Sequence, residues 1–258
     1  MDYIDQTGHK ITLTVTPTRI ISLVPSQTEL LYYLDILPIG QTIFCVHPSD
    51  KYAKSTKIGG TKKLQLDKIK RLNPDLIIGN KEENQKEQIE ELRKTCNVWL
   101  SDIHTISDSN NMISSIGDLV NRQDTAQKLI NQISIGFKNV LQSNTTISVL
   151  YLIWRKPYMA AGRDTFIQDV LHHCGYLNSI EQEDSRYPEL TNEQIATLNP
   201  MEVLLSSEPY PFKDEHMQEL QKTLPEAKIS LVDGELFSWY GPRLLKTIRY
   251  LNAKKSSL

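Results

Sequence analysis

The sequence predicts an α/β protein of two three-layer lobes, with mainly parallel sheets, joined by one long helix. Three observations predict this fold. Strand-like and helix-like segments alternate along the chain, which is typical of parallel βα units. A pattern of the first half recurs in the second half. The stretch 124–143, near the middle of the chain, has apolar residues at helical spacing.

The length and composition agree with two lobes. A chain of 258 residues suits two lobes of about 110 residues each. We expect an N-terminal lobe over 1–108, a helical segment over 109–143 that includes the interlobe helix, and a C-terminal lobe over 144–258. A net charge of −2 gives no electrostatic reason to expect nucleic acid or a membrane surface as a partner. No apolar run approaches the roughly 18 residues that a membrane-spanning helix needs.

The first elements follow from short apolar runs and their boundaries. Apolar residues alternating with Thr predict a strand over 11–15, and an unbroken β-branched run predicts a buried strand over 19–24. A capping box of Ser26 and Glu29 is expected to open a helix directly after that strand. Further strands are expected over 39–46, 75–79 and 96–100, and further helices over 66–72, 82–94 and 107–120.

The interlobe helix is expected over 124–143, with Asp124 as its N-cap. About 20 residues at ~1.5 Å each give a rod of roughly 30 Å, which could act as a stiff connector. An ordinary buried helix of a single domain is the alternative interpretation of the same spacing.

The second half restarts the pattern. Strands are expected over 147–153, 203–205 and 229–232, and helices over 165–174, 193–198 and 214–224. The stretch 236–240 is expected to be a loop. Gly241-Pro242-Arg243 then opens the last helix, because proline suits the first turn of a helix.

Cysteine and histidine patterns exclude several classes of site. The three cysteines, Cys45, Cys96 and Cys174, include no CxxC pair, and no two histidines form HxxxH or HExxH. The sequence therefore supports neither a zinc ribbon nor a redox motif, and we expect no protein-ligated metal site. No nucleophile or acid–base pair is visible, so we expect no enzymatic activity.

An internal repeat is the most informative signal. The run Ile69, Leu72, Asn73-Pro74 recurs as Ile195, Leu198, Asn199-Pro200 at a constant offset of 126. Each copy predicts a short helix ended by Asn-Pro and followed by a strand. Each copy also carries one carboxylate on its polar side, Asp67 in the first and Glu193 in the second. A carboxylate in a first helical turn needs no partner, because it stabilises the helix dipole. The coincidence of pattern and charge nevertheless favours a functional pair.

Five segments in order resemble one family. RIISLVPSQTELLYYL, KIGGTKKLQLDKIKRLNPDLIIG, MAAGRDTFIQDVLHHCGYLNSI, YPELTNEQIATLNP and WYGPRLLKTIRYL together resemble the substrate-binding proteins of ABC importers that take up cobalamin (vitamin B12) and iron–siderophore complexes. The cobalamin receptors look most similar among them. The resemblance implies two lobes on a helical backbone, with a ligand cleft between the lobes.

The resemblance also implies the ligand and the partner. The ligand would be a corrinoid or a ferric chelate, with no intrinsic cofactor. Asp67 and Glu193 match acidic residues that dock to arginines of an ABC permease dimer. The protein would be a monomer that meets the membrane only through that permease. At Thr61 and Asn80 the cobalamin receptors can carry tryptophan, so the chain departs from their pattern there.

Aromatic residues in loops are the candidate ligand contacts, because such rings bury large area at low rotamer cost. Phe44 and Tyr187 match aromatic contact positions of the cobalamin receptors, and Trp239 matches a contact position that need not be aromatic. Packing is the alternative role of each ring. Arg163 could pair with an anionic ligand group or form a surface salt bridge, and His47 could be an axial ligand or a solvated loop residue. The expected ligand-binding set is Phe44, His47, Trp154, Arg163, Tyr187, Trp239 and Tyr240.

Other functions stay open at this point. A receptor for a bare metal ion or haem, a two-lobed enzyme that holds a cluster through cysteines, and a cytoplasmic corrinoid carrier without a permease are alternatives. The family resemblance implies a periplasmic or extracytoplasmic location. The start MDYIDQTGHK has no basic segment followed by an apolar stretch, so no signal peptide is expected in this chain. A cytoplasmic location is expected if Met1 is the native start.

Overall fold

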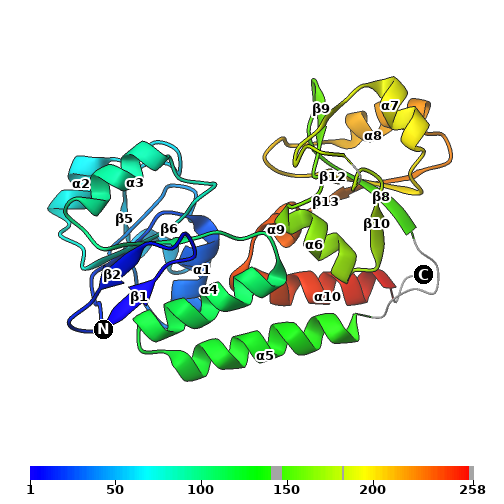
Figure 1. Cartoon of the computed structure of the whole chain (residues 1–258). Helices are drawn as coiled ribbons and strands as arrows, with labels where there is room; N and C mark the ends of the chain where they lie inside the picture. The colour runs from blue at the N-terminus through cyan, green and yellow to red at the C-terminus, as the bar shows by residue number, and fades with distance from the viewer. Residues whose placement is uncertain (141–146, 182, 256–258) are drawn as a thin grey trace. The chain divides into compact units, whose positions relative to one another are not determined.

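A computed structural model describes residues 1–140, 147–181 and 183–255 of the chain (Figure 1). The chain forms two compact units, each assembled from separate stretches of sequence. The first unit contains Met1–Ile103, Ser107–Ile133 and Trp239–Leu244, and the second contains His104–Ile106, Ser134–Ser238 and Leu245–Leu258. The predicted boundaries instead follow the chain in three consecutive segments.

The sheet of the first unit is parallel throughout, as the sequence predicts. Its strand order is β5-β4-β3-β6-β7. Ile20 pairs with Leu76, and Ile77 pairs with Val98, which sets the register of β3, β6 and the edge strand β7. The strands are β3 (Ile20–Ser22), β4 (Gly40–Gln41), β5 (Thr56–Lys57), β6 (Leu76–Asn80) and β7 (Val98–Ser101).

Successive strand residues point to opposite faces of this sheet. Helices pack against the apolar side chains that the strands present. Ile21, Leu23 and Ile77 form one buried cluster with Ile69 and Ile89. The last two residues come from the helices α2 and α3. The helices of this unit are α1 (Pro25–Tyr33), α2 (Leu66–Arg71), α3 (Lys86–Arg93) and α4 (Ile106–Leu119), with the 3₁₀ turn η1 (Tyr52–Lys54); Ile106 itself is grouped with the second unit.

Three boundaries in this unit differ from the prediction. The capping box is wrong: Pro25 takes the first helical position, so the N-cap of α1 is Val24, whose apolar side chain cannot make a cap hydrogen bond, and Ser26 lies inside the helix. The strand over 39–46 shrinks to β4, because the chain turns after Thr42, whose carbonyl accepts the Cys45 N–H. α3 begins only at Lys86, because the Asn80 side chain accepts the N–H groups of residues 82 and 83 in a local turn.

A small hairpin precedes the first sheet. β1 (Asp2–Ile4) pairs antiparallel with β2 (Lys10–Thr12), where the sequence predicts only one strand over 11–15. Asp5 lies in the connecting turn with a fully buried side chain, and its carboxylate accepts the Leu100 N–H at 3.1 Å. The hairpin is therefore anchored to β7.

The sheet of the second unit is mixed. Its order is β11-β9-β8-β12-β13, with β10 also paired to β8. β8, β10, β12 and β13 are parallel, but β9 runs antiparallel to both β8 and β11. The sequence predicts β8, β12 and β13 and misses the other three. The strands are β8 (Ile147–Trp154), β9 (Tyr158–Ala160), β10 (Tyr176–Asn178), β11 (Glu189–Leu190), β12 (Glu202–Ser206) and β13 (Lys228–Val232).

The helices of the second unit match the prediction with one exception. The stretch 236–240, expected to be a loop, begins inside α9 (Glu235–Ser238), whose Leu236 and Phe237 are buried. Thr165 is the N-cap of α6 and accepts the Gln168 N–H. The other helices are α6 (Phe166–His173), α7 (Asn192–Leu198) and α8 (Asp214–Thr223), and the turn η2 (Gly241–Arg243) leads from the first unit into α10 (Leu244–Lys255).

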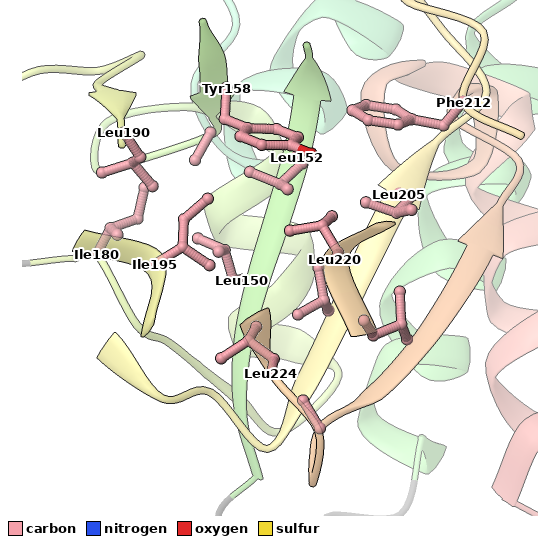
Figure 2. Close-up of a cluster of buried hydrophobic side chains, with 14 residues drawn as sticks. Leu150, Leu152, Tyr158, Ile180, Leu190, Ile195, Leu205, Phe212, Leu220 and Leu224 are labelled. Carbon is pink, nitrogen blue, oxygen red and sulfur yellow. The ribbon is translucent and has the colours of Figure 1, made fainter. Parts of the chain in front are cut away.

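Both faces of this sheet are covered. Leu150 and Leu152 of β8 belong to a buried cluster that includes Leu220 of α8, and Figure 2 shows these side chains together. Tyr151 points to the opposite face, where its ring centroid lies 5.3 Å from that of Phe237 in α9. The alternation gives this unit helices on two sides of one sheet, as a three-layer lobe requires.

One helix contributes residues to both units. α5 (Gln123–Asn139) belongs to the first unit up to Ile133 and to the second from Ser134 onward. Its 17 residues correspond to roughly 25 Å of helix. Asp124 lies inside the first turn and is not the N-cap, because the helix begins at Gln123. Residues 141–143 of the predicted helix lie outside the described residues.

We expect the carboxyl group of Glu91 in α3 to titrate with a pKa of about 2, below its ordinary value of 4.5. Hydrogen bonds and attraction from Lys70 and Lys94, each at 2.7 Å, favour the charged form. The folded pKa is lowered, so the stabilisation is present above about pH 4.5 and is lost as pH falls toward 2.

An NMR titration of the Glu91 side-chain carboxyl carbon measures this pKa. Lys70→Met should move the midpoint toward 4.5, because it removes the largest cause of the shift. A parent midpoint already near the ordinary value would contradict the expectation.

Candidate functional site

Polar side chains gather where the parallel strands of the first unit end. Gln27 of α1 donates to the Gly79 carbonyl at 2.8 Å and to the Ser101 hydroxyl at 2.7 Å. Asn80 donates to the same hydroxyl at 3.0 Å. All three polar residues are buried. This network holds the loops at the carboxyl edge of the sheet, the edge at which ligands bind in open α/β folds.

The loop after β4 exposes three apolar side chains in a short stretch. Phe44 is 54% exposed, and Ile43 and Val46 are also exposed. A Cβ at Gly60 would lie 3.1 Å from the ring of Phe44, so the ring rests on the backbone of that glycine. Between the exposed residues Cys45 is buried, and burial raises the pKa of its thiol. An exposed apolar group on an anchored loop is typical of an interaction site.

A second network fixes the base of this loop. The Gln41 side chain donates to the carbonyls of Cys45 at 3.0 Å and Tyr52 at 2.9 Å. The Tyr32 hydroxyl donates to the Gln41 side-chain oxygen at 2.7 Å, and the Lys57 ammonium donates to the Tyr52 carbonyl at 2.9 Å. The loop that carries Phe44 is thus pre-organised. The sequence does not reveal Tyr32 and Gln41, because their role depends on a contact across the fold.

His47 and Trp239 belong to one stack in the first unit. Their ring centroids lie 5.7 Å apart, edge to face. The guanidinium of Arg243 lies 4.8 Å from the Trp239 ring centroid and donates to Glu29 at 3.0 Å. The alternating rings and charges connect the loop of His47 to helix α1.

Trp239 and Tyr240 differ from the other predicted ligand contacts in exposure. They are only 9% and 4% exposed, respectively. Burial, the largest cause, raises the pKa of Tyr240 well above its ordinary value, and the hydroxyls of Ser26 and Ser101 lie beside it. In this structure both rings are packed, which is the alternative role that the sequence left open.

In the second unit a close backbone approach positions Tyr187. Gly162 donates its N–H to the Arg186 carbonyl at 2.8 Å, and a Cβ at Gly162 would lie 2.8 Å from the Ser185 carbonyl oxygen. Only glycine fits at that distance. Tyr187 is 38% exposed, and the Arg186 guanidinium lies 5.6 Å from its ring centroid. Arg186 also donates to the Asp164 carbonyl at 2.8 Å, which fixes its position.

Arg163 precedes α6 and forms the surface salt bridge that was its alternative role. Its Nη2 atom lies 3.3 Å from Asp184, and the two side chains are 46% and 98% exposed. An exposed pair of this kind contributes little stability. The guanidinium can therefore exchange Asp184 for another anion at low cost.

Trp154 stands at the end of β8 beside an aromatic cluster. Its ring centroid lies 5.5 Å from that of Tyr210, which in turn contacts Phe212 and His216. The Trp154 side chain is 41% exposed, whereas Phe212 and His216 are buried. The cluster therefore supports one exposed indole. The sequence analysis missed the cluster, although the closely spaced Tyr210 and Phe212 were a signal.

The two short helices of the internal repeat are alike in structure. Asp67 and Glu193 are exposed and each is the second residue of its helix, α2 or α7. Ile69 and Ile195 are fully buried. The Asn of each Asn-Pro pair has a positive φ, 45° for Asn73 and 41° for Asn199. β6 and β12 follow at the same offset of 126. The structure confirms the repeat.

The described residues hold neither a cluster of metal ligands nor a helix that could cross a membrane. Within 1–140, 147–181 and 183–255, no group of three or more His, Cys, Asp or Glu residues could hold a metal ion. In that same part of the chain no helix has both the length and the apolar character to cross a membrane.

Comparison with known proteins gives consistent matches. The chain is 23% identical to an uncharacterised ABC transporter substrate-binding lipoprotein, YvrC of Bacillus subtilis, over 96% of this chain and 82% of that protein. It is 26% identical to a vitamin B12-binding protein of Vibrio parahaemolyticus, over 73% of this chain and 70% of the relative. The fold matches that of the periplasmic haem-binding protein HutB of Vibrio cholerae, with a TM-score of 0.80 at 20% identity over 92% and 98% of the two chains.

A sequence profile shows the family itself. The profile described as "Periplasmic binding protein" matches residues 20–228. This family consists of substrate-binding proteins and not of enzymes, which confirms the prediction that the chain has no enzymatic role. Because the match spans most of the chain and both repeats, this protein belongs to the periplasmic binding protein family.

Proposed function

We propose that this protein captures a corrinoid or a ferric siderophore outside the cytoplasm and delivers it to the permease of an ABC importer. The printed names of the relatives support this proposal: one is a substrate-binding lipoprotein of an ABC transporter and another is a vitamin B12-binding protein. The ligand is cargo, and the protein carries no resident cofactor.

The observation that carries the proposal is that aromatic side chains are exposed to solvent while neighbouring residues hold them in place. Phe44 rests on Gly60 in the first unit, and Trp154 and Tyr187 are held by packed neighbours in the second. Rings that are already immobilised lose little entropy when they bind a large, partly apolar ligand. Arg163 adds a cation that can meet a carboxylate or phosphate of such a ligand.

Haem is a second candidate, favoured by one residue. His47 lies three residues after Phe44 and is partly exposed, with its ring against Trp239. A neutral imidazole in that position can ligate haem iron. A corrinoid or a siderophore complex does not require this ligand.

The docking proposal uses the repeat. Asp67 and Glu193 are exposed carboxylates on equivalent short helices. We propose that they meet the two halves of a permease dimer, and that the binding protein acts as a monomer. The charges involved are exposed, so docking should weaken as salt is raised.

A ligand panel tests the proposal. The purified protein is titrated calorimetrically with cyanocobalamin, cobinamide, a ferric hydroxamate siderophore and haemin, followed by gel filtration and an absorption spectrum. We expect one of the first three to bind with a Kd below about 1 μM, which corresponds to roughly 8 kcal/mol. Retention of haemin alone, with a Soret shift that His47→Ala removes, would favour the haem candidate. Retention of none by folded protein would refute both.

Phe44→Ala is expected to weaken binding of the retained ligand by about tenfold, because it deletes an exposed ring from a pre-organised loop. Leu37→Ala is the matched control, since Leu37 is comparably exposed but lies in the loop before β4, away from the carboxyl edge of the sheet. Calorimetry of both variants measures the effect. Equal affinities for the parent and Phe44→Ala would remove Phe44 from the site.

A further inference from the structure

The two repeat copies carry opposite charge. Residues 57–71 contain six Lys or Arg and one Asp, a net formal charge of +5. The equivalent residues 183–197, at the same offset of 126, contain four Asp or Glu and one Arg, a net formal charge of −3. The two copies share the same helix and strand arrangement, but their net charges have opposite sign.

The cations of the first copy lie on and before α2, and we call them the basic surface: Lys62, Lys63, Lys68, Lys70 and Arg71. Lys63 and Arg71 are exposed. Lys68 donates to a neutral carbonyl, that of Lys57, at 2.6 Å, and Lys62 donates to the carbonyl of Glu82. Of the five cations, Lys70 is the one held by a carboxylate in the ion pairs of the described residues, at 2.7 Å from Glu91.

The neighbouring helix does not neutralise this surface. α3 packs beside α2 and carries Glu87, Glu90 and Glu91. Glu90 pairs with Arg93 at 2.9 Å, and Glu91 is shared between Lys70 and Lys94. Two of the three carboxylates of α3 are therefore already paired with cations, and the charge of Glu87 alone does not cancel the net formal charge of +5 over residues 57–71, so the basic surface stays positive.

The anions of the second copy lie on and before α7, and we call them the acidic surface: Glu183, Asp184, Glu189 and Glu193, all exposed. α7 itself has no basic residue in its last turn. Arg163 reaches Asp184 at 3.3 Å, but both side chains are well exposed. The net charge of this surface stays negative.

The two docking carboxylates consequently differ in their surroundings. Asp67 is followed by cations one, three and four residues later on its own helix, Lys68, Lys70 and Arg71, so its charge is locally compensated. Glu193 has Ala196 and Thr197 at the equivalent spacings. A hydrogen bond from Thr191, the largest cause, lowers the pKa of Glu193, which keeps its carboxylate charged.

We propose that the basic surface docks on an acidic, carboxylate-bearing face of the permease, while the acidic surface docks on a cationic face. The proposal rests on the proposed function and deepens it, since it gives the two halves of the partner opposite charge. Charge complementarity is the reason: a partner with arginines facing both helices would be repelled by the net positive basic surface, and like-charge contacts suppress docking. Asp67 then contributes a single contact within a cationic surface.

Charge reversals on the full chain test the proposal. The purified protein, carrying a fluorescent label, is titrated into membrane vesicles from the organism that encodes this chain. The vesicles expose the extracytoplasmic face of the membrane. The variants are K63E/R71E on the basic surface and E189K/E193K on the acidic surface. K128E/K138E on α5 is the matched control for K63E/R71E, because it makes the same change in net charge with exposed lysines. Circular dichroism verifies that each variant is folded.

We expect both surface variants to bind the vesicles at least about tenfold more weakly at 50 mM NaCl, and the control to bind within about twofold of the parent. Carbodiimide cross-links should join lysines of the basic surface to Asp or Glu of a polytopic membrane protein, and Glu189 or Glu193 to its lysines. The direction in which K63E/R71E changes the affinity for the vesicles is decisive. Docking through carboxylates on both lobes predicts that this variant binds as well as the parent or better. That result would overturn the proposal.

Two further arms separate the alternatives. The first arm uses protein-free vesicles of phosphatidylglycerol and phosphatidylethanolamine. If these bind the parent protein as tightly as the native membranes do, the basic surface binds lipid headgroups, which also overturns the proposal. The ligand panel is repeated on K63E/R71E, and we expect the affinity of the parent. If the parent protein retains no ligand of the panel, the proposed function is refuted. If it retains a ligand but K63E/R71E and E189K/E193K bind the native vesicles as tightly as the parent does, this inference alone is refuted.

Discussion

Replacing Arg243 with methionine is expected to lower the free energy of unfolding by about 3–5 kcal/mol, because it removes the cation from Glu29, whose side chain is only 12% exposed. The two side chains are separated by 214 positions in sequence and joined by a 3.0 Å hydrogen bond, with only 4% and 12% of their surfaces exposed. The same guanidinium covers the Trp239 ring. Urea unfolding followed by circular dichroism measures the loss.

A double-mutant cycle separates the pair from its surroundings. Replacing both partners, in R243M/E29M, should recover most of the lost stability, since two apolar side chains of similar volume leave no buried charge unpaired. The fluorescence of Trp239 should change in both variants, because both lose the covering guanidinium. A loss below about 1 kcal/mol in R243M would show that water or the other contacts of Glu29 compensate its charge, and it would contradict this prediction.

Asp5→Ala is expected to destabilise the protein by a similar amount, about 3–5 kcal/mol. One fully buried carboxylate accepts from the Thr7 N–H at 2.9 Å, the His9 N–H at 2.8 Å and the Leu100 N–H at 3.1 Å, and it pairs with Arg93 at 2.9 Å. Alanine leaves these donors without an acceptor in a site that is largely closed to water.

The same hairpin supplies the control for this prediction. Asp2 pairs with Lys10 at 2.6 Å, but both side chains are more than half exposed. Asp2→Ala should therefore leave the urea midpoint unchanged within error. Hydrogen exchange should accelerate at the amides of His9 and Leu100 in Asp5→Ala alone. An unchanged midpoint for Asp5→Ala would mean that the hairpin is not anchored through this carboxylate.

Most regular elements could be predicted from local sequence. The repeat of Asn-Pro after a short amphipathic helix predicted α2 and α7, and both asparagines adopt the left-handed conformation that ends a helix. Short runs of mostly apolar residues predicted β3, β6, β8 and β12, because such runs are typical of buried parallel strands. These signals act over a few residues, so distant contacts did not disturb them.

The errors in the fold arose where a neighbour decided the conformation. β9 and β11 are short, and they form because the N–H groups of Ala160 and Gly162 donate to the carbonyls of Pro188 and Arg186. The predicted strand over 39–46 stops at Gln41, because the side chain of Gln41 instead binds the carbonyls of the following loop. β11 and Tyr52 are not adjacent in sequence to the segments they bind, so propensity could not reveal either contact.

The candidate site shows the same division. The sequence indicated aromatic residues in loops, and it could not decide which rings face solvent. Phe44, Trp154 and Tyr187 are exposed, whereas Trp239 and Tyr240 are packed. The difference follows from neighbours such as Gly60, which supports Phe44, and Arg243, which covers Trp239.

By itself the sequence determined the two-lobed α/β plan, the internal repeat, the family and the opposite charges of the two repeat helices. Each of these depends on residue type and spacing along the chain. Only the tertiary structure decided which aromatic rings are exposed, which strands complete the second sheet, and which charges are buried in pairs. Those outcomes depend on side chains that approach across the fold, as Glu29 and Arg243 do, and the desolvation and packing that govern them do not exist until the chain has folded.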